Sequence, residues 1–417
     1  MSNKVGAMSM KQETQRELKP KLRFPEFWEA GEWGSAFGNA IFDQISNKDH
    51  NSDLPVLAIT QEHGAIPRNL INYHVSVAEK SIEVYKVVEA GEFIISLRSF
   101  QGGIEYSEYK GICSPAYVIL RLKPGNLAHF FRHFLKTVRF IGQLNKNIEG
   151  LRDGKMVSYK QFSELRLPTP SLQEQQKITD CLSSLDELIT AQTQKLDKLK
   201  IHKKGLMQQL FPAEGENLPR LRFTEFWEAG EWDKDDLGKV AFFVNERIAL
   251  DHLPLANYVS TENILPDYEG LITASKLPSS GHATRFKIND ILISNIRPYL
   301  KKVWYASKEG GASNDVIVVR AKEGIISQYL SFMLKNNAFI EYVMKGAKGV
   351  KMPRGDISLI KEYPFAYPSK TEQIRIADCL SSLDELITAQ TQKLDKLKAH
   401  KKGLMQQLFP AQDEVSA

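Results

Sequence analysis

The sequence lacks the features of a secreted, disulfide-bonded or membrane-spanning protein. It has 3 cysteines in 417 residues and no CxxC or Cys/His cluster, so we expect neither a disulfide framework nor a zinc site. No run of about eighteen apolar residues occurs, so no membrane span is expected. The first residues are polar and lack an apolar core, which favours a flexible leader over a secretory signal. These absences predict a reducing, cytoplasmic location and no membrane partner.

Signatures of catalysis are also missing. Gly150–Lys155 superficially resembles a phosphate-binding loop, but its first glycine is too close to the Gly-Lys pair and no Ser or Thr follows. His129 and His133 share one face of an expected helix, yet no third metal ligand is nearby in sequence, so a packing role is the simpler interpretation. We therefore expect no catalytic residue and no metal site.

What is present is an ordinary globular composition with a mild positive charge. The chain has 42% hydrophobic and 25% charged residues and a net charge of +5. This length allows two to four domains, each with a core of its own. The charge permits a nucleic-acid partner but does not require one.

The chain contains an internal repeat. The segment DCLSSLDELITAQTQKLDKLKIHKKGLMQQLFPA at 180–213 recurs at 378–411 with a single change. LRFPEFWEAGEW at 22–33 recurs at 221–232, also with a single change. The order of parts is therefore a short head, a variable block and a long segment, and then the same three parts again.

Each long segment is predicted to form a coiled-coil helix. Apolar residues alternate at spacings of three and four, as in an a/d seam, and Gln192 and Lys203 interrupt the first copy. A Ser-x-x-Glu capping box precedes each copy, and Pro212 and Pro410 are expected to end the helices. Each helix would have about 39 residues and a length of ~58 Å. The predicted seam residues are Leu182, Leu185, Ile189, Leu196, Leu199, Leu206 and Leu210 in the first copy and Leu380, Leu383, Ile387, Leu394, Leu397, Leu404 and Leu408 in the second.

A helix this long needs a partner for its apolar stripe. It could pack on its own block alone, but two near-identical copies separated by a whole domain favour an antiparallel pair with pseudo-twofold symmetry. The copied parts are thus predicted to be a scaffold. Copied Trp28, Trp33, Trp227 and Trp232 are expected to anchor it, with base stacking as the alternative. The copied run Lys195–Lys204 is expected to be a solvated or subunit-docking face, with phosphate contact as the alternative.

The two variable blocks are predicted to be mixed α/β domains of one fold. β-Branched apolar runs suggest strands, and longer apolar segments suggest helices. The matching segments are strands at 59–64 and 259–264, 91–96 and 289–294, and 113–122 and 312–321, followed by helical segments at 127–144 and 326–344.

The blocks differ most between their paired strands, at 96–111 and 294–311. Both stretches are rich in Arg, Lys, Ser, Asn, Gln, Tyr and Gly, which supply phosphate contacts and base-edge hydrogen bonds. We predict two different DNA-reading surfaces on one frame. The candidate DNA-binding residues are Arg68, Arg98, Ser99, Gln101, Tyr106, Lys110 and Lys155 in the first block and Asn295, Arg297, Tyr299, Lys301, Lys302, Lys351 and Arg354 in the second.

These parts and their order resemble the specificity subunit of type I restriction-modification enzymes. The resemblance rests on LRFPEFWEAGEW, on the entries LPTPSLQEQQKI and AYPSKTEQIRI, and on the duplicated ending KKGLMQQLFP. It implies an α+β fold in which two target-recognition domains each read one half of a split, asymmetric DNA sequence, while two long helices form an antiparallel coiled coil. Half-sites read on one face of B-DNA lie about one turn, ~34 Å, apart, and helices of ~58 Å are long enough to set that spacing.

The resemblance also implies partners and cofactors. Two modification subunits would dock on the frame and methylate adenine with S-adenosylmethionine, and up to two restriction subunits would add an ATP- and Mg²⁺-dependent nuclease. This chain would bind double-stranded DNA and hold no cofactor. It has no Pro-Pro pair and so lacks the (N/D)PP(Y/F) tetrapeptide of adenine methyltransferases. Two alternatives are a coiled-coil adaptor with two non-DNA binding domains and a self-sufficient DNA enzyme.

The predicted organisation follows the repeat. It comprises a flexible leader at 1–20, a first target-recognition domain with its head at 21–167, a scaffold helix at 168–212, a linker at 213–220, a second target-recognition domain with its head at 221–365, a second scaffold helix at 366–410 and a tail at 411–417.

Overall fold

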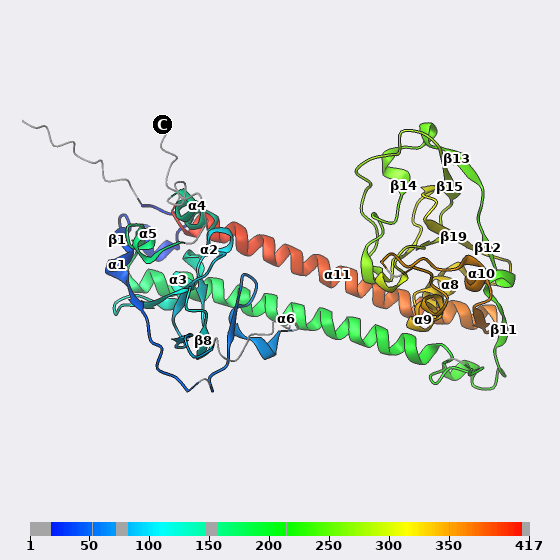
Figure 1. The fold of residues 1–417 in the computed structure, drawn as a ribbon, viewed down its shortest axis with the longest axis horizontal. Coiled ribbons are helices and arrows are strands. Elements are labelled where there is room, and N and C mark those ends of the chain that lie inside the picture. The colour runs from blue at the N-terminus through cyan, green and yellow to red at the C-terminus, as the bar shows by residue number, and fades with distance from the viewer. Residues whose placement is uncertain are drawn as a thin grey trace, which may run out of the picture. The chain divides into compact units, whose positions relative to one another are not determined.

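A computed structural model describes residues 18–51, 53–71, 82–146, 157–213, 215–349 and 351–410. The chain divides into two compact units, Met1–Gln192 with Lys393–Ala417, and Thr193–Gln392. Each unit holds one variable domain together with part of each long helix (Figure 1). Most of the predicted leader, the tail after residue 410, and Lys155 lie outside the described residues. None of the described helices has the length and apolar character needed to cross a membrane.

The described residues of the first unit form ten strands and five short α-helices besides its share of the long helices. The strands are β1 (Gly34–Phe37), β2 (Phe42–Ile45), β3 (Leu57–Thr60), β4 (Gly64–Pro67), β5 (Lys86–Val88), β6 (Phe93–Ile95), β7 (Glu105–Tyr106), β8 (Gly111–Cys113), β9 (Val118–Leu122) and β10 (Arg166–Thr169). The helices are α1 (Gly38–Ile41), α2 (Ser99–Gly102), α3 (Ala128–Phe134), α4 (Val138–Lys146) and α5 (Tyr159–Ser163).

The second unit has a closely similar set of elements. Its strands are β11 (Asp233–Asp236), β12 (Ala241–Phe243), β13 (Arg247–Ala249), β14 (Tyr258–Val259), β15 (His282–Phe286), β16 (Ile291–Ser294), β17 (Val303–Tyr305), β18 (Gly310–Ala312), β19 (Val316–Ala321) and β20 (Pro364–Tyr367). Its short helices are α7 (Leu237–Val240), α8 (Ser327–Leu334), α9 (Asn337–Lys345) and α10 (Ile357–Lys361).

The same central sheet occurs in both units. Its strand order is β2-β9-β6-β7 in the first and β12-β19-β16-β17 in the second, with antiparallel neighbours throughout. A two-stranded antiparallel pair, β1-β10 or β11-β20, follows each head. The second unit adds a four-stranded sheet, β13-β15-β18-β14. The prediction of two mixed α/β domains of one fold is therefore confirmed.

Each predicted helical segment of the domains consists of two helices. The break falls at residues whose side chains cap a new helix. Thr137 Oγ1 accepts a hydrogen bond from the N–H of Phe140 at 3.2 Å, before α4. Asn336 Oδ1 accepts one from the N–H of Ala338 at 3.2 Å, before α9. Such side chains compete with the helical backbone for its hydrogen bonds, so they end one helix and start the next.

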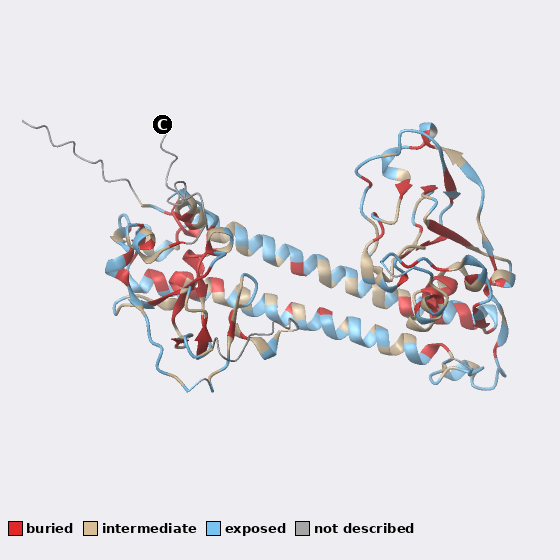
Figure 2. Ribbon diagram, in the orientation of Figure 1, coloured by how far each residue is buried: buried red, intermediate tan, exposed pale blue. Residues whose placement is uncertain are grey.

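The long segments form α6 (Leu172–Leu210) and α11 (Lys370–Leu408), each of 39 residues, as predicted. None of the predicted seam residues is exposed. Those buried most deeply are Leu182, Leu196, Leu210, Leu380, Leu394 and Leu408, while the others are half-buried. The outer faces of both helices are exposed (Figure 2). An apolar stripe covered along its length is the property that a paired helix requires.

Within each unit α6 and α11 run antiparallel and share an ion pair. In the first unit Lys401 Nζ lies 2.5 Å from Asp186 Oδ1, and in the second Lys203 Nζ lies 2.5 Å from Asp384 Oδ1. Lys401 and Asp384 are the copies of Lys203 and Asp186, so both units use the same contact with the helices exchanged. Lys203, predicted as an interruption of the seam, thus aligns the two helices.

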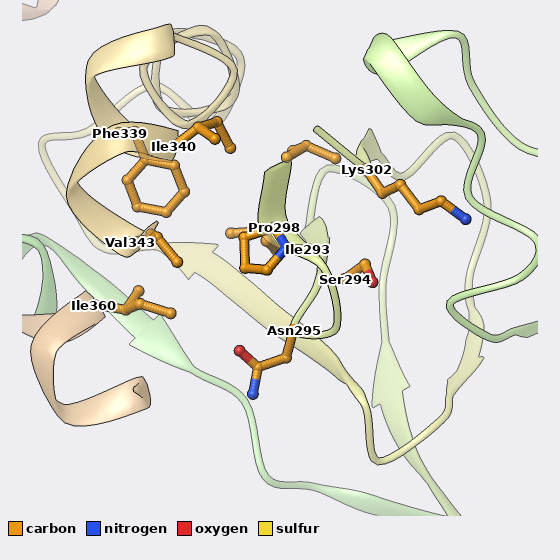
Figure 3. A pocket seen from close by; sticks show the side chains of 10 residues that line it. Ile293, Ser294, Asn295, Pro298, Lys302, Phe339, Ile340, Val343 and Ile360 are labelled. Atoms are coloured by element: carbon orange, nitrogen blue, oxygen red, sulfur yellow. The ribbon is translucent and has the colours of Figure 1, made fainter. Parts of the chain in front are cut away.

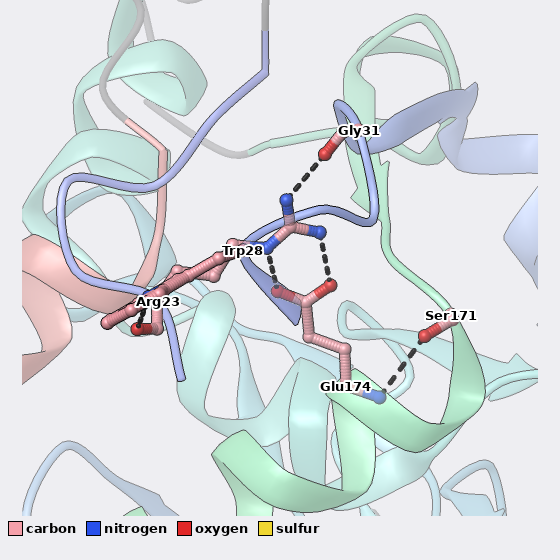
Figure 4. Close-up of polar contacts among 5 residues, drawn as sticks. All are labelled: Arg23, Trp28, Gly31, Ser171 and Glu174. Carbon is pink, nitrogen blue, oxygen red and sulfur yellow. Dashed lines mark hydrogen bonds and ion pairs between the residues drawn. The ribbon is translucent and has the colours of Figure 1, made fainter. Parts of the chain in front are cut away.

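A buried ion pair joins the first head to its long helix. The Arg23 guanidinium donates to both carboxylate oxygens of Glu174, at 2.7 and 2.8 Å (Figure 4). The two side chains are 5% and 2% exposed. Ser171 Oγ accepts a hydrogen bond from the N–H of Glu174 at 3.3 Å. The serine of the predicted capping box therefore caps the helix, whereas the Glu174 carboxylate is bound by Arg23.

The second head repeats this arrangement. Arg222 donates to both carboxylate oxygens of Glu372 at 2.8 Å, and Ser369 Oγ accepts from the N–H of Glu372 at 3.4 Å. Each arginine also donates to a glycine carbonyl of its own head, Gly31 or Gly230. Because a two-pronged arginine–carboxylate pair fixes orientation as well as distance, head and helix form one rigid part.

Copied aromatic residues fasten each domain to the scaffold. Trp33 and Trp232 are 4% and 5% exposed, which confirms the anchoring role predicted for them. Phe409, which follows α11, lies 5.4 Å from Phe130 between ring centres. Phe211, which follows α6, lies 5.5 Å from Tyr329. Each long helix thus ends in the core of a variable domain.

A buried histidine lies where the first domain meets the helix pair. His133 is 4% exposed, and its Nδ1 is 4.0 Å from Asp186 Oδ2. Burial lowers the pKa of His133 from 6.5 to about 3, and the positive charge of Lys401 acts in the same direction. The corresponding position of α8 in the second unit is Phe332, so an apolar ring is compatible with this site.

Replacing Arg23 by Ala should destabilise the protein by about 3–5 kcal/mol, because Glu174 would remain buried without its partner. Removing both charges, in Arg23→Ala with Glu174→Ala, should cost less than the single change. The exposed pair of Arg285 and Glu246 provides the control, since Arg285→Ala should cost below about 1 kcal/mol. Urea unfolding measures all three, and a loss for Arg23→Ala as small as the control would contradict a stabilising anchor.

Replacing His133 by Phe should reduce acid sensitivity. The unfolded imidazole takes up a proton as the pH falls through 6.5, but the folded one does so only near 3. The wild type therefore loses stability as the pH falls from 6.5 towards 3, by about 2 kcal/mol at about pH 5 from this group. The variant should lack that loss, whereas the control His202→Phe, at an exposed histidine, should keep it. Equal acid sensitivity of wild type and His133→Phe in urea titrations would rule out this role.

Candidate nucleic-acid interface

In the second domain, the candidate residues cluster on two segments that meet. The loop Asn295–Lys302, called here the 295–302 loop, follows β16, and the segment Lys351–Gly355 precedes α10. The N–H of Arg297 donates to the carbonyl oxygen of Pro353 at 2.8 Å, and Ile296 forms a β-bridge with Arg354. The structure thus brings together two stretches selected independently from the sequence.

Within the 295–302 loop the candidate side chains have different surroundings. Arg297 and Tyr299 are exposed, and Tyr299 reaches 48%. Lys301 is half-buried, and the Lys302 ammonium donates to the carbonyl oxygen of Thr261 at 2.8 Å. Asn295 is half-buried, and its Oδ1 is buried with no hydrogen-bond partner among the described residues. Arg297 and Tyr299 are therefore the side chains of this loop most open to a ligand.

The turn between β18 and β19 contributes residues that the sequence analysis missed. Asp315 Oδ1 lies 3.0 Å from Arg354 Nη2, and its carbonyl oxygen accepts from the N–H of Asn295 at 2.8 Å. Asn314 Oδ1 accepts from Arg247 Nη2 at 2.9 Å. The Asn-Asp pair before β19 is typical of a turn, but it was included in the predicted strand at 312–321. Asp315 ties this turn to both candidate segments.

In the first domain, two of the candidate arginines lie close to one tyrosine. Burial raises the pKa of Tyr117, while the positive charges of Arg68 and Arg98 oppose that shift. Arg98 and Gln101 are exposed at α2. Ser99 is 1% exposed, and its Oγ accepts from the N–H of Ser96 at 2.8 Å. The Ser99 hydroxyl therefore stabilises the turn and does not lie on the surface.

Two further candidates of the first domain, Tyr106 and Lys110, contact other residues of this chain. Tyr106 packs on Phe93 with ring centres 5.1 Å apart, and burial raises its pKa. Lys110 Nζ lies 2.9 Å from Glu89 Oε1, with both side chains partly exposed. Lys155 lies outside the described residues. Tyr106 is thus mainly a packing residue, whereas Arg98 and Gln101 are exposed and Arg68 is half-buried.

In the ranges that the structure describes, no group of three or more His, Cys, Asp and Glu side chains is placed to hold a metal ion. The arrangement consists of guanidinium, ammonium, amide and phenol groups on loops, which donate hydrogen bonds and attract anions. Such groups suit binding to phosphates and base edges.

A second exposed surface occurs in both copies, and we call it the head surface. In the first unit it comprises Trp28, 61% exposed, beside the ion pair of Glu26 and Lys177 at 2.8 Å. In the second unit it comprises Trp227, 68% exposed, beside the ion pair of Glu225 and Arg375 at 3.2 Å. The anchoring role predicted for these two tryptophans applies only to their Nε1 atoms, which donate to backbone carbonyls of Arg23 and Arg222.

The predicted docking face on the long helix is partly exposed. In the run Lys195–Lys204, the side chains of Lys195, Lys198, Lys200 and Lys204 are exposed. The Lys203 ammonium instead forms an ion pair with the Asp384 carboxylate. Lys200 Nζ lies 4.0 Å from Glu269 Oε1, with both side chains largely exposed. The run is therefore a mostly solvated face.

Comparison with known proteins places these features in a family. Residues 31–200 and 250–399 match the family model described as the type I restriction modification DNA specificity domain. A relative from Methanocaldococcus jannaschii, the putative type I restriction enzyme MjaX specificity subunit, is 25% identical over 312 residues, covering 71% of this chain and 69% of its own.

Solved structures share the fold. The type I restriction-modification system S subunit from M. genitalium is similar over 95% of this chain and 100% of its own, with a TM-score of 0.55 and 17% identity. A chain from a study of assembly and conformational transition of the type I R-M system covers 91% and 98%, with a TM-score of 0.53 and 15% identity. Because the two matched stretches of the family model include most of the chain, this chain belongs to the type I restriction modification DNA specificity domain family.

Proposed function

We propose that this chain is the DNA sequence-recognition subunit of a type I restriction-modification complex. Each variable domain reads one half of a split, asymmetric sequence in double-stranded DNA, and the helix pair sets the spacing between the halves. The observation that carries this proposal is one fold bearing two different exposed surfaces, with Arg98 and Gln101 on one and Arg297 and Tyr299 on the other. Copied residues cannot distinguish two half-sites, whereas these divergent loops can.

The chemistry then belongs to partner subunits. Two modification subunits bind the scaffold and methylate adenine with S-adenosylmethionine, and up to two restriction subunits add the ATP- and Mg²⁺-dependent nuclease. This chain supplies recognition and holds none of these cofactors. The complex acts in the cytoplasm, where the DNA is. Family membership supports this assignment over a coiled-coil adaptor with two non-DNA binding domains.

The direct test is to map methylated adenines in the genome of a host that expresses this chain together with its modification subunit. We expect methylation at one split motif with a gap of fixed length, because two readers in one chain recognise both halves at once. A host that expresses the modification subunit alone is the control and should show no such motif. Methylation without sequence preference, or at a continuous motif, would contradict the proposal. The isolated chain should not methylate or cleave DNA when given Mg²⁺ and S-adenosylmethionine.

The head surfaces are the sites where we expect the modification subunits to dock. An exposed tryptophan beside an ion pair has the composition of a binding hot spot. The two surfaces are copies, Trp28 with Glu26 and Trp227 with Glu225, so each suits the same partner. The recurrence of tryptophan, glutamate and a cationic partner, Lys177 in one copy and Arg375 in the other, supports a pair of equivalent subunits.

Trp28→Ala and Trp227→Ala should each weaken the binding of one modification subunit by about 10-fold or more. The fold should be retained, because both rings are exposed. Mass photometry at graded concentrations of modification subunit should show complexes with one such subunit for each single variant and mostly free chain for the double variant. Leu255→Ala, at an exposed residue outside the head surfaces, should assemble like the wild type. Unchanged assembly of the double variant would exclude docking at these surfaces.

A further inference from the structure

The 295–302 loop contains backbone conformations that side-chain-bearing residues normally avoid. Arg297 has φ 52° and ψ 62°, and Lys301 has φ 54° and ψ 43°. Asp267 and Tyr268, with φ 50° and 64°, lie in the adjoining loop, where the N–H of Tyr268 donates to the carbonyl oxygen of Lys301 at 3.2 Å. Among the described non-glycine residues, the remaining one with positive φ is Asn289. Asparagine and aspartate tolerate this region, whereas tyrosine, arginine and lysine normally avoid it. Left-handed strain is thus concentrated where these two loops touch.

The surrounding structure holds this strain in place. The N–H groups of Leu300 and Lys301 donate to the carbonyl oxygens of Arg297 and Pro298, each at 2.9 Å. The ring of Pro298 is buried against α9, beside Phe339 and Val343, at a cavity of about 10 Å³ (Figure 3). The loop is therefore already ordered in the free protein, so a ligand does not have to order it on binding.

Asn295 fixes the base of the loop. Its N–H donates to the carbonyl oxygen of Asp315 at 2.8 Å, and its own carbonyl accepts from the N–H of Gly355 at 3.2 Å. A Cβ at Gly355 would lie 2.8 Å from Asn295 Oδ1, so a larger residue there would require the Asn295 side chain to shift. Figure 3 shows the Asn295 side chain lining the cavity with Pro298 and Ile360. Asn295, selected from the sequence as a DNA contact, is therefore a positioning residue.

The strain at Arg297 does not serve the fold. Its side chain is exposed and forms no hydrogen bond or ion pair with the described residues. Glycine would adopt the same backbone without steric conflict. Strain of this kind that persists with a side chain in place is characteristic of functional sites, where the backbone orients a group for a ligand.

Arg297 is the one arginine of the two segments whose side chain has no partner among the described residues, whereas three neighbouring cations are paired. Arg354 lies 3.0 Å from Asp315, Lys302 donates to Thr261, and Lys348 lies 3.0 Å from Asp356. Those groups are held by protein acceptors, whereas the guanidinium of Arg297 is available. A guanidinium fork fits the O6 and N7 acceptors of guanine in the major groove.

We propose that Arg297 is the specificity-determining residue of the second domain and reads a guanine of its half-site from the strained 295–302 loop. Lys301 and Lys351 lie on the same two segments and contact the flanking phosphates. This inference rests on the proposed function, since it identifies the reader within one of the two recognition domains. The first domain has α2 in place of this loop, so the effect is restricted to one half-site.

Two substitutions separate the guanidinium from the strain. Arg297→Ala removes the guanidinium but keeps a side chain in the left-handed region, while Arg297→Gly removes both. The reconstituted complex with modification subunits is assayed for methylation rates on duplexes carrying every base pair at each position of both half-sites. Both variants should lose discrimination at one position of one half-site by about 10–100-fold and leave the other half-site unchanged. The thermal midpoint of Arg297→Gly should be equal to that of the wild type or higher by about 2–4 °C.

Arg220→Ala is the control, because Arg220 is an exposed arginine of the same unit, 3.8 Å from Glu216 and outside both loops. It should leave discrimination unchanged. Wild-type methylation of a split motif together with unaltered discrimination in both Arg297 variants would overturn this inference and leave the proposed function intact. A uniform loss on all sequences with a lower thermal midpoint would assign Arg297 a structural role and also overturn it. Methylation by the wild type without sequence preference would refute the proposed function itself.

Discussion

A long helix with an apolar stripe is not stable alone in water, and this constraint underlies the rest of the structure. Here the cover for each 39-residue helix is its own copy, together with a variable domain at each end. Leu182 and Leu408 belong to one buried cluster, and Leu210 and Leu380 belong to another. The lysine–aspartate pairs fix the antiparallel alignment that brings these residues together. The heads are then attached to the helices through Arg–Glu pairs. These pairs require the glutamate to lie in the first turn of its helix, as Glu174 and Glu372 do.

Features with local signals were predictable from the sequence, and features set by distant contacts were not. The bounds of α6 and α11 follow from apolar spacing, the serine caps and the terminal prolines, and the central strands follow from β-branched runs. The pair of Arg23 and Glu174 joins residues far apart in the chain, and Glu174 had a sufficient local explanation as a capping residue. A signal was nevertheless present, because Arg222 and Glu372 repeat the same two residue types at the same two places.

The candidate site was predicted at the level of segments but not of side chains. Residue types selected two segments of the second domain that contact each other in the structure, since both are polar and basic. Types do not determine orientation, however, because orientation depends on what each backbone group contacts. The Ser99 hydroxyl is buried and accepts a hydrogen bond from the N–H of Ser96, and the Lys302 ammonium donates to the carbonyl oxygen of Thr261. Arg297 instead lies exposed on a left-handed backbone. Asp315 escaped selection because a carboxylate repels DNA, yet here it positions Arg354 and the loop base.

The distribution of copied and divergent residues separates two kinds of ligand. Packing alone requires identity at the seam and at the anchors, but the identity extends to exposed positions such as Leu188 and Leu386, 53% and 48% exposed. The copied residues contact different residues in the two domain cores. Phe409 packs on Phe130, whereas the equivalent Phe211 packs on Tyr329. The scaffold's exposed surface is thus more uniform than the cores it joins. Equal surfaces suit two equal protein partners, and unequal loops suit a DNA sequence whose halves differ. A chain with repeated scaffold segments and divergent loops meets both requirements.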